Sequence, residues 1–311
     1  MNAQTLPQLD GRPMVTDGGM ETDLIFHHGV DLPLFAAFPL VDSPSGRSLL
    51  TAYYDEYAAI ARRAGAGLML ESATWRASGD WGDRLGYSPA DLARVNRDAI
   101  SMLAELRERY RDGLADVVIS GMVGPRGDGY QPVEEPGPDE AAGYHAAQVE
   151  ALAAAGADIV SAYTLTSIGE AIGIVRAASS ATSAGSAGVP VAISFTVETD
   201  GRLPGGESLA EAITRVDAAA SPAYFQVNCA HPVHVAAALA EPGSWRERIY
   251  GVRYNASTRS HAELDEAADL DEGDIGLLAD RHRQLAAGLP ALAIVGGCCG
   301  TDARHVEALW T

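Results

Sequence analysis

Three cysteines are the residues of this sequence most suited to chemistry, because each one ends an apolar segment typical of a buried strand. They are Cys229 in AYFQVNCA (223–230) and the adjacent pair Cys298 and Cys299 in ALAIVGGCC (291–299). We expect Gly296 and Gly297 to let the backbone turn, so that both neighbouring thiols face one ion. Three thiolates can bind one zinc ion and leave the fourth tetrahedral position open, which is the arrangement of catalytic zinc.

The ligand type also predicts the kind of reaction. Sulfur-only ligation selects zinc over magnesium or calcium, and closed-shell zinc suits a reaction without electron transfer. Zinc bound by three thiolates is a weak electrophile toward carbonyls, because the sulfurs return negative charge to it. Such a Zn2+ site is better suited to bind and deprotonate a further thiol, which can then attack a methyl group on a cationic sulfur or nitrogen. The cysteines therefore predict methyl transfer to sulfur.

Other interpretations of the cysteines stay open. Free cysteines often fill small buried spaces. Cys298 and Cys299 would also suit a redox pair or a zinc store that performs no methyl transfer, although adjacent cysteines form only a strained disulfide. A metal-free lyase that works through a Schiff base is disfavoured, because the sequence contains no lysine.

The elements that must position the cysteines alternate between strand and helix. Eight apolar segments end in small or polar residues, at 14–19, 67–74, 117–125, 158–166, 190–197, 223–230, 249–255 and 291–299. Helical spacing is clearest in 48–66, 91–110 and 139–157. This alternation indicates a parallel α/β sheet, and eight strands without a break in composition predict a TIM (β/α)8 barrel, a single domain over residues 1–311. All three cysteines then lie at strand carboxyl ends, where barrel enzymes keep their active sites.

The connecting segments carry further expectations. SSATSAGSAG (179–188) is predicted to be a surface loop between a helix and a strand. PRGDGYQPVEEPGP (125–138) and GRLPGGE (201–207) follow strands three and five, so they are candidate lids or substrate loops. The acidic run HAELDEAADLDEGD (261–274) is interpreted as a solvated surface rather than a cation site.

Composition excludes several classes of partner. A formal net charge of -20 without a basic cluster disfavours nucleic acid and anionic membranes. No apolar stretch reaches the roughly 18 residues of a membrane span, and the first residues lack a secretory pattern, so we expect a cytoplasmic protein. Three cysteines also argue against a secreted disulfide framework. The sequence is compatible with a homo-oligomer but does not specify one.

Several motifs, in order along nearly the whole chain, resemble the homocysteine S-methyltransferases. They are TDGGMETDL (16–24), SATWRAS (72–78), GMVGPRG (121–127), ISFTVETDGRLPGGESLAEAI (193–213), VNCAHPVHV (227–235) and VGGCCGTDARHVEAL (295–309). The last two are highly specific. The resemblance implies a TIM barrel whose zinc ligands are Cys229, Cys298 and Cys299.

The same resemblance suggests substrate residues. Asp17, Gly18 and Gly19 correspond to the pocket of the thiol substrate, and Asn228 and Asn255 to polar residues that shape the site. A purely structural role is the alternative for two of them. Asp17 could cap a turn with its two glycines, and Asn228 could pair with the backbone beside a metal ligand.

One position departs from the family pattern. Family members that use homocysteine commonly have a glutamate at the end of strand four, in a motif like FETIPS, that can hold the ammonium of the amino acid. Here AYTLTS (162–167) has Tyr163 at that place. Glu71 at the end of strand two is a candidate substitute or a structural ion-pair partner. The rings of Trp75 and Tyr163 could face a cationic donor or pack in the barrel mouth, and Phe195 is expected to pack in the core.

These observations predict a zinc-dependent S-methyltransferase that uses two small molecules, a methyl donor and a thiol acceptor. The donor is an onium compound of the S-methylmethionine, S-adenosylmethionine or betaine type. The default acceptor is homocysteine, which would give methionine and place the enzyme in methionine biosynthesis. Because Tyr163 replaces the glutamate, the alternative is a methyltransferase or demethylase that acts on a different small thiol.

Overall fold

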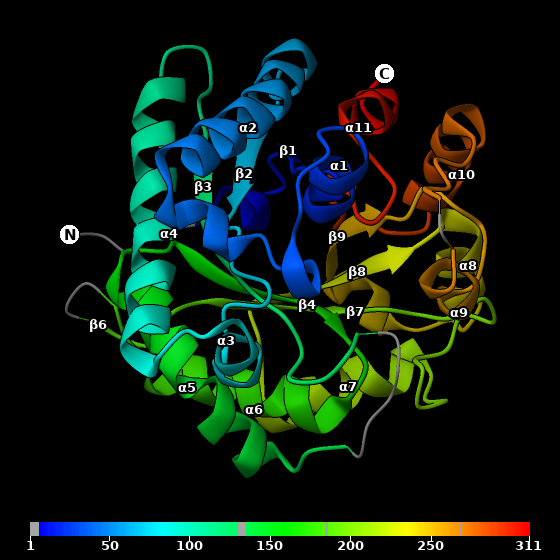
Figure 1. The fold of residues 1–311 in the computed structure, drawn as a ribbon. Helices are drawn as coiled ribbons and strands as arrows, with labels where there is room; N and C mark the ends of the chain where they lie inside the picture. The colour runs from blue at the N-terminus through cyan, green and yellow to red at the C-terminus, as the bar shows by residue number, and fades with distance from the viewer. Residues whose placement is uncertain (1–5, 130–134, 184–185, 268) are drawn as a thin grey trace.

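Eight parallel strands close a barrel in chain order, as the sequence predicts (Figure 1). The computed structural model describes residues 6–129, 135–183, 186–267 and 269–311. The barrel strands are β1 (Met14–Val15), β2 (Gly67–Glu71), β3 (Val117–Val123), β4 (Ile159–Leu165), β7 (Val191–Phe195), β8 (Tyr224–Ala230), β9 (Ile249–Tyr254) and β10 (Ile294–Gly297). Each lies within one of the eight predicted segments. The α/β fold class, a TIM barrel, is therefore confirmed.

Helices surround the barrel. They are α1 (Met20–Phe26), α2 (Pro44–Ala64), α3 (Gly79–Leu85), α4 (Pro89–Tyr110), α5 (Pro138–Ala154), α6 (Ile168–Ser180), α7 (Leu209–Ala220), α8 (Pro232–Ala238), α9 (His261–Asp265), α10 (Ile275–Ala286) and α11 (Ala303–Leu309). The predicted helices correspond to α2, α4 and α5. Local sequence sets their ends: Ser43 caps α2 by accepting from the Gly46 N–H at 3.0 Å, and Gly65 ends it with a φ of 64°.

The barrel interior changes from apolar to polar along its axis. One end is filled by a buried apolar cluster to which seven strands contribute, namely Leu6, Met14, Met69, Val118, Ile159, Ala192, Tyr224 and Ile294. Polar side chains follow toward the strand carboxyl ends, where the Ser120 hydroxyl donates to Ser161 at 2.7 Å. The larger apolar cluster lies between strands and helices. Polar chemistry is therefore confined to one end of the barrel.

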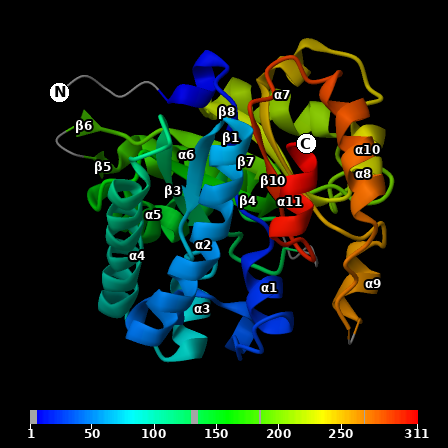
Figure 2. The same ribbon diagram turned by 90° about the horizontal axis from the view of Figure 1, so that it is seen from above.

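That end carries additional short helices. Figure 2 shows α1, α3 and α9 together at one end of the barrel, while the 3-10 helix Pro7–Asp10 lies at the other. Each of the three helices comes soon after a barrel strand, so this end is the one formed by strand carboxyl ends. No helix in the described part of the chain has the length and apolar character needed to cross a membrane.

Two connecting segments differ from their predictions. In 179–188 a short antiparallel pair, β5 (Thr182–Ser183) and β6 (Ser186–Ala187), replaces the predicted loop, and the Gly188 N–H closes it onto the Ala181 carbonyl at 2.7 Å. The acidic run 261–274 is not simply a solvated surface. It begins with α9, whose buried His261 points inward, and part of it lines the main cavity.

The two candidate lids have different positions. Residues 125–129 and 135–138 of the first lie in the described part, and Asp128 lines the main cavity; 130–134 fall outside the described residues. The second, 201–207, is fully described and contributes no residue to the lining of that cavity. A substrate-loop role is therefore compatible with the first segment and unsupported for the second.

Candidate metal centre and substrate cavity

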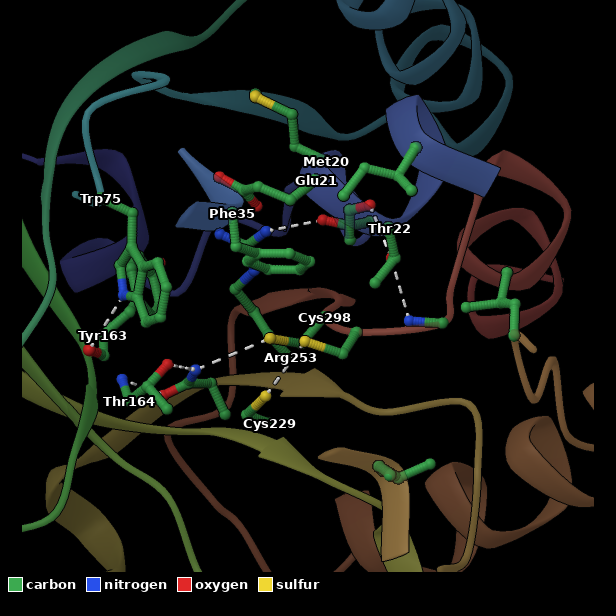
Figure 3. A pocket seen from close by; sticks show the side chains of 18 of the residues that line it. Met20, Glu21, Thr22, Phe35, Trp75, Tyr163, Thr164, Cys229, Arg253 and Cys298 are labelled. Atoms are coloured by element: carbon green, nitrogen blue, oxygen red, sulfur yellow. Dashed lines mark hydrogen bonds between the residues drawn. The ribbon is translucent and has the colours of Figure 1, made fainter. Parts of the chain in front are cut away.

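The three cysteines meet at the polar end of the barrel (Figure 3). Their sulfur atoms all lie within 4.8 Å of one another, and Cys229 Sγ is 3.5 Å from Cys299 Sγ. A tetrahedral site with Zn–S bonds near 2.3 Å has sulfurs about 3.8 Å apart. The residues brought together from β8 and from the end of β10 therefore fit a zinc ion by both donor type and spacing. We call these three residues the thiol floor.

An irregularity in β8 turns Cys229 into the cavity. Successive side chains of a regular strand point to opposite faces, yet Asn228 and Cys229 both line the same cavity. The register between β8 and β9 shifts between Asn228 and Ala230, and Cys229 has a φ of 57°. A bulge of this kind redirects one side chain. Left-handed backbone is unfavourable for a cysteine, so neighbouring contacts must stabilise it.

Those contacts converge on the Cys229 carbonyl. It accepts hydrogen bonds from Thr196 Oγ1 at 3.3 Å, Asn255 Nδ2 at 3.0 Å and His261 Nε2 at 2.6 Å. Glu198 Oε1 lies 2.9 Å from the other ring nitrogen of His261 and orients the ring. Asn255 thus shapes the site through the backbone of Cys229 rather than from the cavity wall. We call these four supporting residues the carbonyl clamp.

The glycines before the cysteine pair are required by close packing rather than by a turn. Neither Gly296 nor Gly297 has a positive φ, contrary to the expected turn; the left-handed residue is Gly300, with a φ of 78°. A Cβ on Gly296 would lie 2.5 Å from the Thr16 side chain and 2.7 Å from its carbonyl. Side chains there would separate β10 from β1, so the glycines bring the two strand ends together.

The electrostatics of the thiol floor favour a thiolate. The pKa of Cys298 is lowered well below its usual value, first by hydrogen bonds from the Cys229 and Cys299 thiols and further by the charge of Arg253. Burial raises the pKa of Cys229, which makes it a thiol donor to its neighbour. Of the three sulfurs, Cys298 Sγ is therefore the one that these contacts favour as a thiolate, beside the place where a metal cation would lie.

A buried ion pair between Arg253 and Asp17 supports the floor. Arg253 Nη2 lies 2.6 Å from Asp17 Oδ1 and 3.0 Å from the Gly18 carbonyl, while its Nε donates to the Gly297 carbonyl at 2.9 Å. Tyr53 donates to the second Asp17 oxygen at 3.1 Å. One guanidinium thus ties β9 to the ends of β1 and β10. Sequence reasoning missed Arg253, although a charge inside the apolar segment IYGVRYN is a usable signal.

The predicted pocket residues Gly18 and Gly19 line the cavity at its base. A Cβ on Gly18 would lie 2.8 Å from the Thr301 carbonyl, and one on Gly19 would lie 2.5 Å from the Cys298 carbonyl. Any side chain on Gly19 would therefore displace a cysteine of the thiol floor. Their first role in the structure is this close approach.

Asn228 connects the thiol floor to the end of β4. Its Oδ1 accepts from the Thr164 N–H at 2.9 Å and from Ser194 Oγ at 2.7 Å, and its Nδ2 lies 3.8 Å from Cys298 Sγ. Thr164 has a φ of 60°, which is unusual for a β-branched residue. Asn228 therefore stabilises an irregular β4 end and faces a cysteine at the same time.

Tyr163 is held inside the barrel by Glu71. The Tyr163 hydroxyl donates to Glu71 Oε1 at 2.6 Å and accepts from Gln226 Nε2 at 3.2 Å. Glu71 is 0 % exposed and does not line the cavity. Within the described residues its carboxylate forms no ion pair, so it holds Tyr163 by a hydrogen bond rather than acting as the expected ion-pair partner. The guanidinium carbon of Arg253 lies 4.9 Å from the centre of the Tyr163 ring. One face of that ring therefore already has a cation.

The other aromatic candidates differ in position. Trp75 lines the cavity, and its Nε1 donates to the Tyr163 carbonyl at 3.4 Å. The guanidinium of Arg76 lies 4.9 Å from the centre of the Trp75 ring. Phe195 is fully buried in the strand–helix core and does not line the cavity. Only Trp75 and Tyr163 of these rings therefore reach the substrate space.

A cavity of about 450 Å³ opens above the thiol floor, a size typical of small-molecule sites. Its far side is formed by α1, the segment after it and the acidic run, with Glu21, Phe35, Leu264, Asp265 and Asp269 among the lining residues. We call these five residues the outer wall. Figure 3 shows the Glu21 carboxylate above the Phe35 ring, extended toward the side on which Trp75 lies. Sequence reasoning did not select Glu21, although it lies in the quoted motif TDGGMETDL.

Comparison with known proteins identifies a family for the chain and relatives with the same fold. The sequence family described as Homocysteine S-methyltransferase matches residues 14–311. Selenocysteine Se-methyltransferase from Brassica oleracea var. italica is 25% identical over 317 residues, which cover 95% of this chain and 87% of that protein. The metallated form of the homocysteine methyltransferase MmuM from Escherichia coli superposes with a TM-score of 0.74 at 22% identity, covering 99% of both chains. The oxidized form of the same protein superposes with a TM-score of 0.71 at 22% identity, covering 96% of this chain and 94% of that one. At this identity the structural likeness supports the barrel fold alone.

Proposed function

The chain belongs to the homocysteine S-methyltransferase family and is a methyltransferase for a thiol or selenol; on that premise we propose that it depends on zinc and transfers a methyl group from an onium donor to a bound thiol. Cys229, Cys298 and Cys299 are the proposed metal ligands. The observation that carries this proposal is the convergence of three sulfurs within 4.8 Å at the base of a substrate-sized cavity.

Cys229, Cys298 and Cys299 would hold a zinc ion through their sulfurs, whose spacing suits it, and three protein ligands would leave room for a substrate sulfur as a fourth. When bound, the metal would accept the acceptor's sulfur there and lower the pKa of its thiol. The chain's own residues fix the geometry: the carbonyl clamp holds Cys229, and Asp17 with Arg253 holds the β1 and β10 ends beside Cys298. Pre-organised ligands reduce the entropic cost of assembling donor and acceptor in line.

The transfer itself is a displacement at carbon. The acceptor's sulfur forms a bond to the methyl carbon, and the bond from that carbon to the positively charged sulfur or nitrogen of the donor breaks. The electron pair of the broken bond neutralises the donor, and the proton of the acceptor thiol goes to solvent. No side chain has to accept the methyl group.

Homocysteine is the default acceptor, with methionine as product, because the family and its motifs point to it. The donor remains open among S-methylmethionine, S-adenosylmethionine and betaine types. A second candidate, transfer to or from a different small thiol, is favoured by one observation: Tyr163, at the place of the family's glutamate, is bonded to buried Glu71 and offers no carboxylate. Residues 1–311 as one domain, a cytoplasmic location and a homo-oligomer remain predictions.

The test combines metal content with turnover. Purified protein and Cys298→Ala are assayed for zinc per chain by mass spectrometry and for methyl transfer from S-methylmethionine to homocysteine. We expect about one zinc and turnover in the wild type, and neither in the variant. Unchanged turnover after zinc removal would reject the metal dependence. Zinc without turnover would favour another thiol, which assays with simple thiols lacking an ammonium group would then identify.

A further inference from the structure

The substrate cavity contains one carboxylate that has no role in the proposed metal binding or methyl transfer. The acidic residues among its described lining are Asp17, Glu21, Asp128, Asp265, Asp269 and Asp271. Asp17 is neutralised by Arg253, and Asp128 lies 3.9 Å from Arg76 Nη2. Asp271 accepts from Ser257 at 2.7 Å. These three carboxylates therefore already have partners.

The remaining three differ in exposure. Asp265 and Asp269 are exposed at the mouth of the cavity, where water solvates their charge. Glu21 is partly buried at the start of α1. Within the described part of the chain its carboxylate has no hydrogen bond except to its own N–H, and it has no ion pair. A carboxylate that is shielded from water and has no cation beside it is unfavourable unless a ligand supplies the cation.

The surroundings of Glu21 make its negative charge still less favourable without a neighbouring cation. Burial raises the pKa of Glu21 to about 7, and the negative charges of Cys298 and Asp17 act in the same direction. Arg253 opposes them but is already paired with Asp17. Figure 3 places the carboxylate over the Phe35 ring and on the cavity side of α1, within the space above the thiol floor. A small cation in the cavity would therefore meet Glu21 before any other shielded acid.

We propose that Glu21 pairs with the positive charge of a substrate, either the ammonium group of an amino-acid acceptor or the onium group of the donor. The proposal rests on the proposed function, because it concerns the substrates of the same cavity. It also explains how the cavity can recognise a cation although Tyr163 offers no carboxylate at the end of β4 and Glu71 is closed off beneath it. The recognising carboxylate would then come from α1, on the opposite side of the cavity.

The test measures binding without turnover. Dissociation constants are determined by calorimetry on zinc-loaded wild type, Glu21→Gln and the matched control Glu105→Gln, which removes an exposed carboxylate on α4. The probes are homocysteine and 4-mercaptobutyrate, which is the same thiol acid without the ammonium group. S-methylmethionine and methionine form a second pair that differs in the sulfonium group.

If the acceptor's ammonium is the partner, Glu21→Gln raises the dissociation constant of homocysteine about 10-fold or more. The dissociation constant of 4-mercaptobutyrate then changes less than about 2-fold. If the donor's onium is the partner, the dissociation constant of S-methylmethionine rises by that amount and that of methionine does not. Affinities in Glu21→Gln that stay within about 2-fold for both cations, or fall equally for charged and uncharged probes, would overturn the proposal.

The two proposals can fail separately. Zinc content in Glu21→Gln must equal that of the wild type, since Glu21 is not a metal ligand, and this also shows that the variant has folded. A wild type that binds homocysteine through Glu21 but transfers no methyl group would refute the proposed function and leave Glu21 assigned. A wild type that transfers methyl groups, but whose substrate binding does not depend on Glu21, would support the proposed function and refute the role of Glu21.

Discussion

The thiol floor and the outer wall enclose the same cavity but are held in different ways. The carbonyl of one floor residue, Cys229, accepts three side-chain hydrogen bonds, and Arg253 fixes the backbone before Cys298. On the wall, Glu21 has no partner among the described residues, and Asp265 and Asp269 are exposed. The floor is fixed by many mutually supporting contacts, whereas the wall can change with little structural cost. We infer that the floor determines the chemistry and the wall determines which substrate is used.

The largest effect should come from breaking the ion pair beneath the floor. Arg253→Met leaves Asp17 buried without its cation, which should lower the free energy of unfolding by about 3–5 kcal/mol. Urea denaturation measures this loss. Adding Asp17→Asn to the same chain removes the stranded charge and should recover part of the stability. A loss below about 1 kcal/mol in the single variant would show that the floor is not held by this pair.

A smaller effect is expected from the carbonyl clamp. Asn255→Ala removes one donor to the Cys229 carbonyl and should weaken zinc binding about 10–100-fold, as loss of support for a metal ligand generally does. Competition with a chromophoric chelator measures the zinc affinity. Asn96→Ala is the control, because Asn96 is a buried asparagine that bonds the Ala77 and Leu92 carbonyls away from the cysteines. Equal zinc affinities in the two variants would contradict the role of the clamp.

The smallest effect is expected in the pH dependence of stability, through His282 on the far side of the thiol floor. Burial lowers the pKa of His282 to about 4, and its Nδ1 lies 3.1 Å from the hydroxyl of Tyr254, the residue between Arg253 and Asn255. Because the folded state resists protonation, His282 contributes stability above its unfolded pKa of about 6.5. That stability is lost as the pH falls from about 6.5 to 4.

Stability measured against pH tests this response. His282→Gln should flatten the loss between these pH values, whereas the same change at the exposed His28 should not. Identical acid profiles for the wild type and His282→Gln would mean that other groups cause the loss.

The sequence predicted the floor better than the wall, for physical reasons. Strand positions follow from local apolar patterns, so the expected segment 158–166 contains β4 and the cysteines fall at strand ends as predicted. Cys229 reaches the cavity only through a bulge in which its φ is 57°. No residue type in this segment predicts that backbone conformation. Its partner His261 lies 32 positions away, in a run interpreted as solvated surface. Glu21 stands out only when its lack of a partner is visible.

The central claim is that three thiolates hold zinc and leave one position for the acceptor's sulfur. X-ray absorption at the zinc edge of the wild type, with and without homocysteine, tests it most directly. We predict three sulfur neighbours at about 2.3 Å with one lighter neighbour in the free protein, and four sulfur neighbours after homocysteine is added. A zinc shell dominated by nitrogen or oxygen, or one that homocysteine leaves unchanged, would contradict the account.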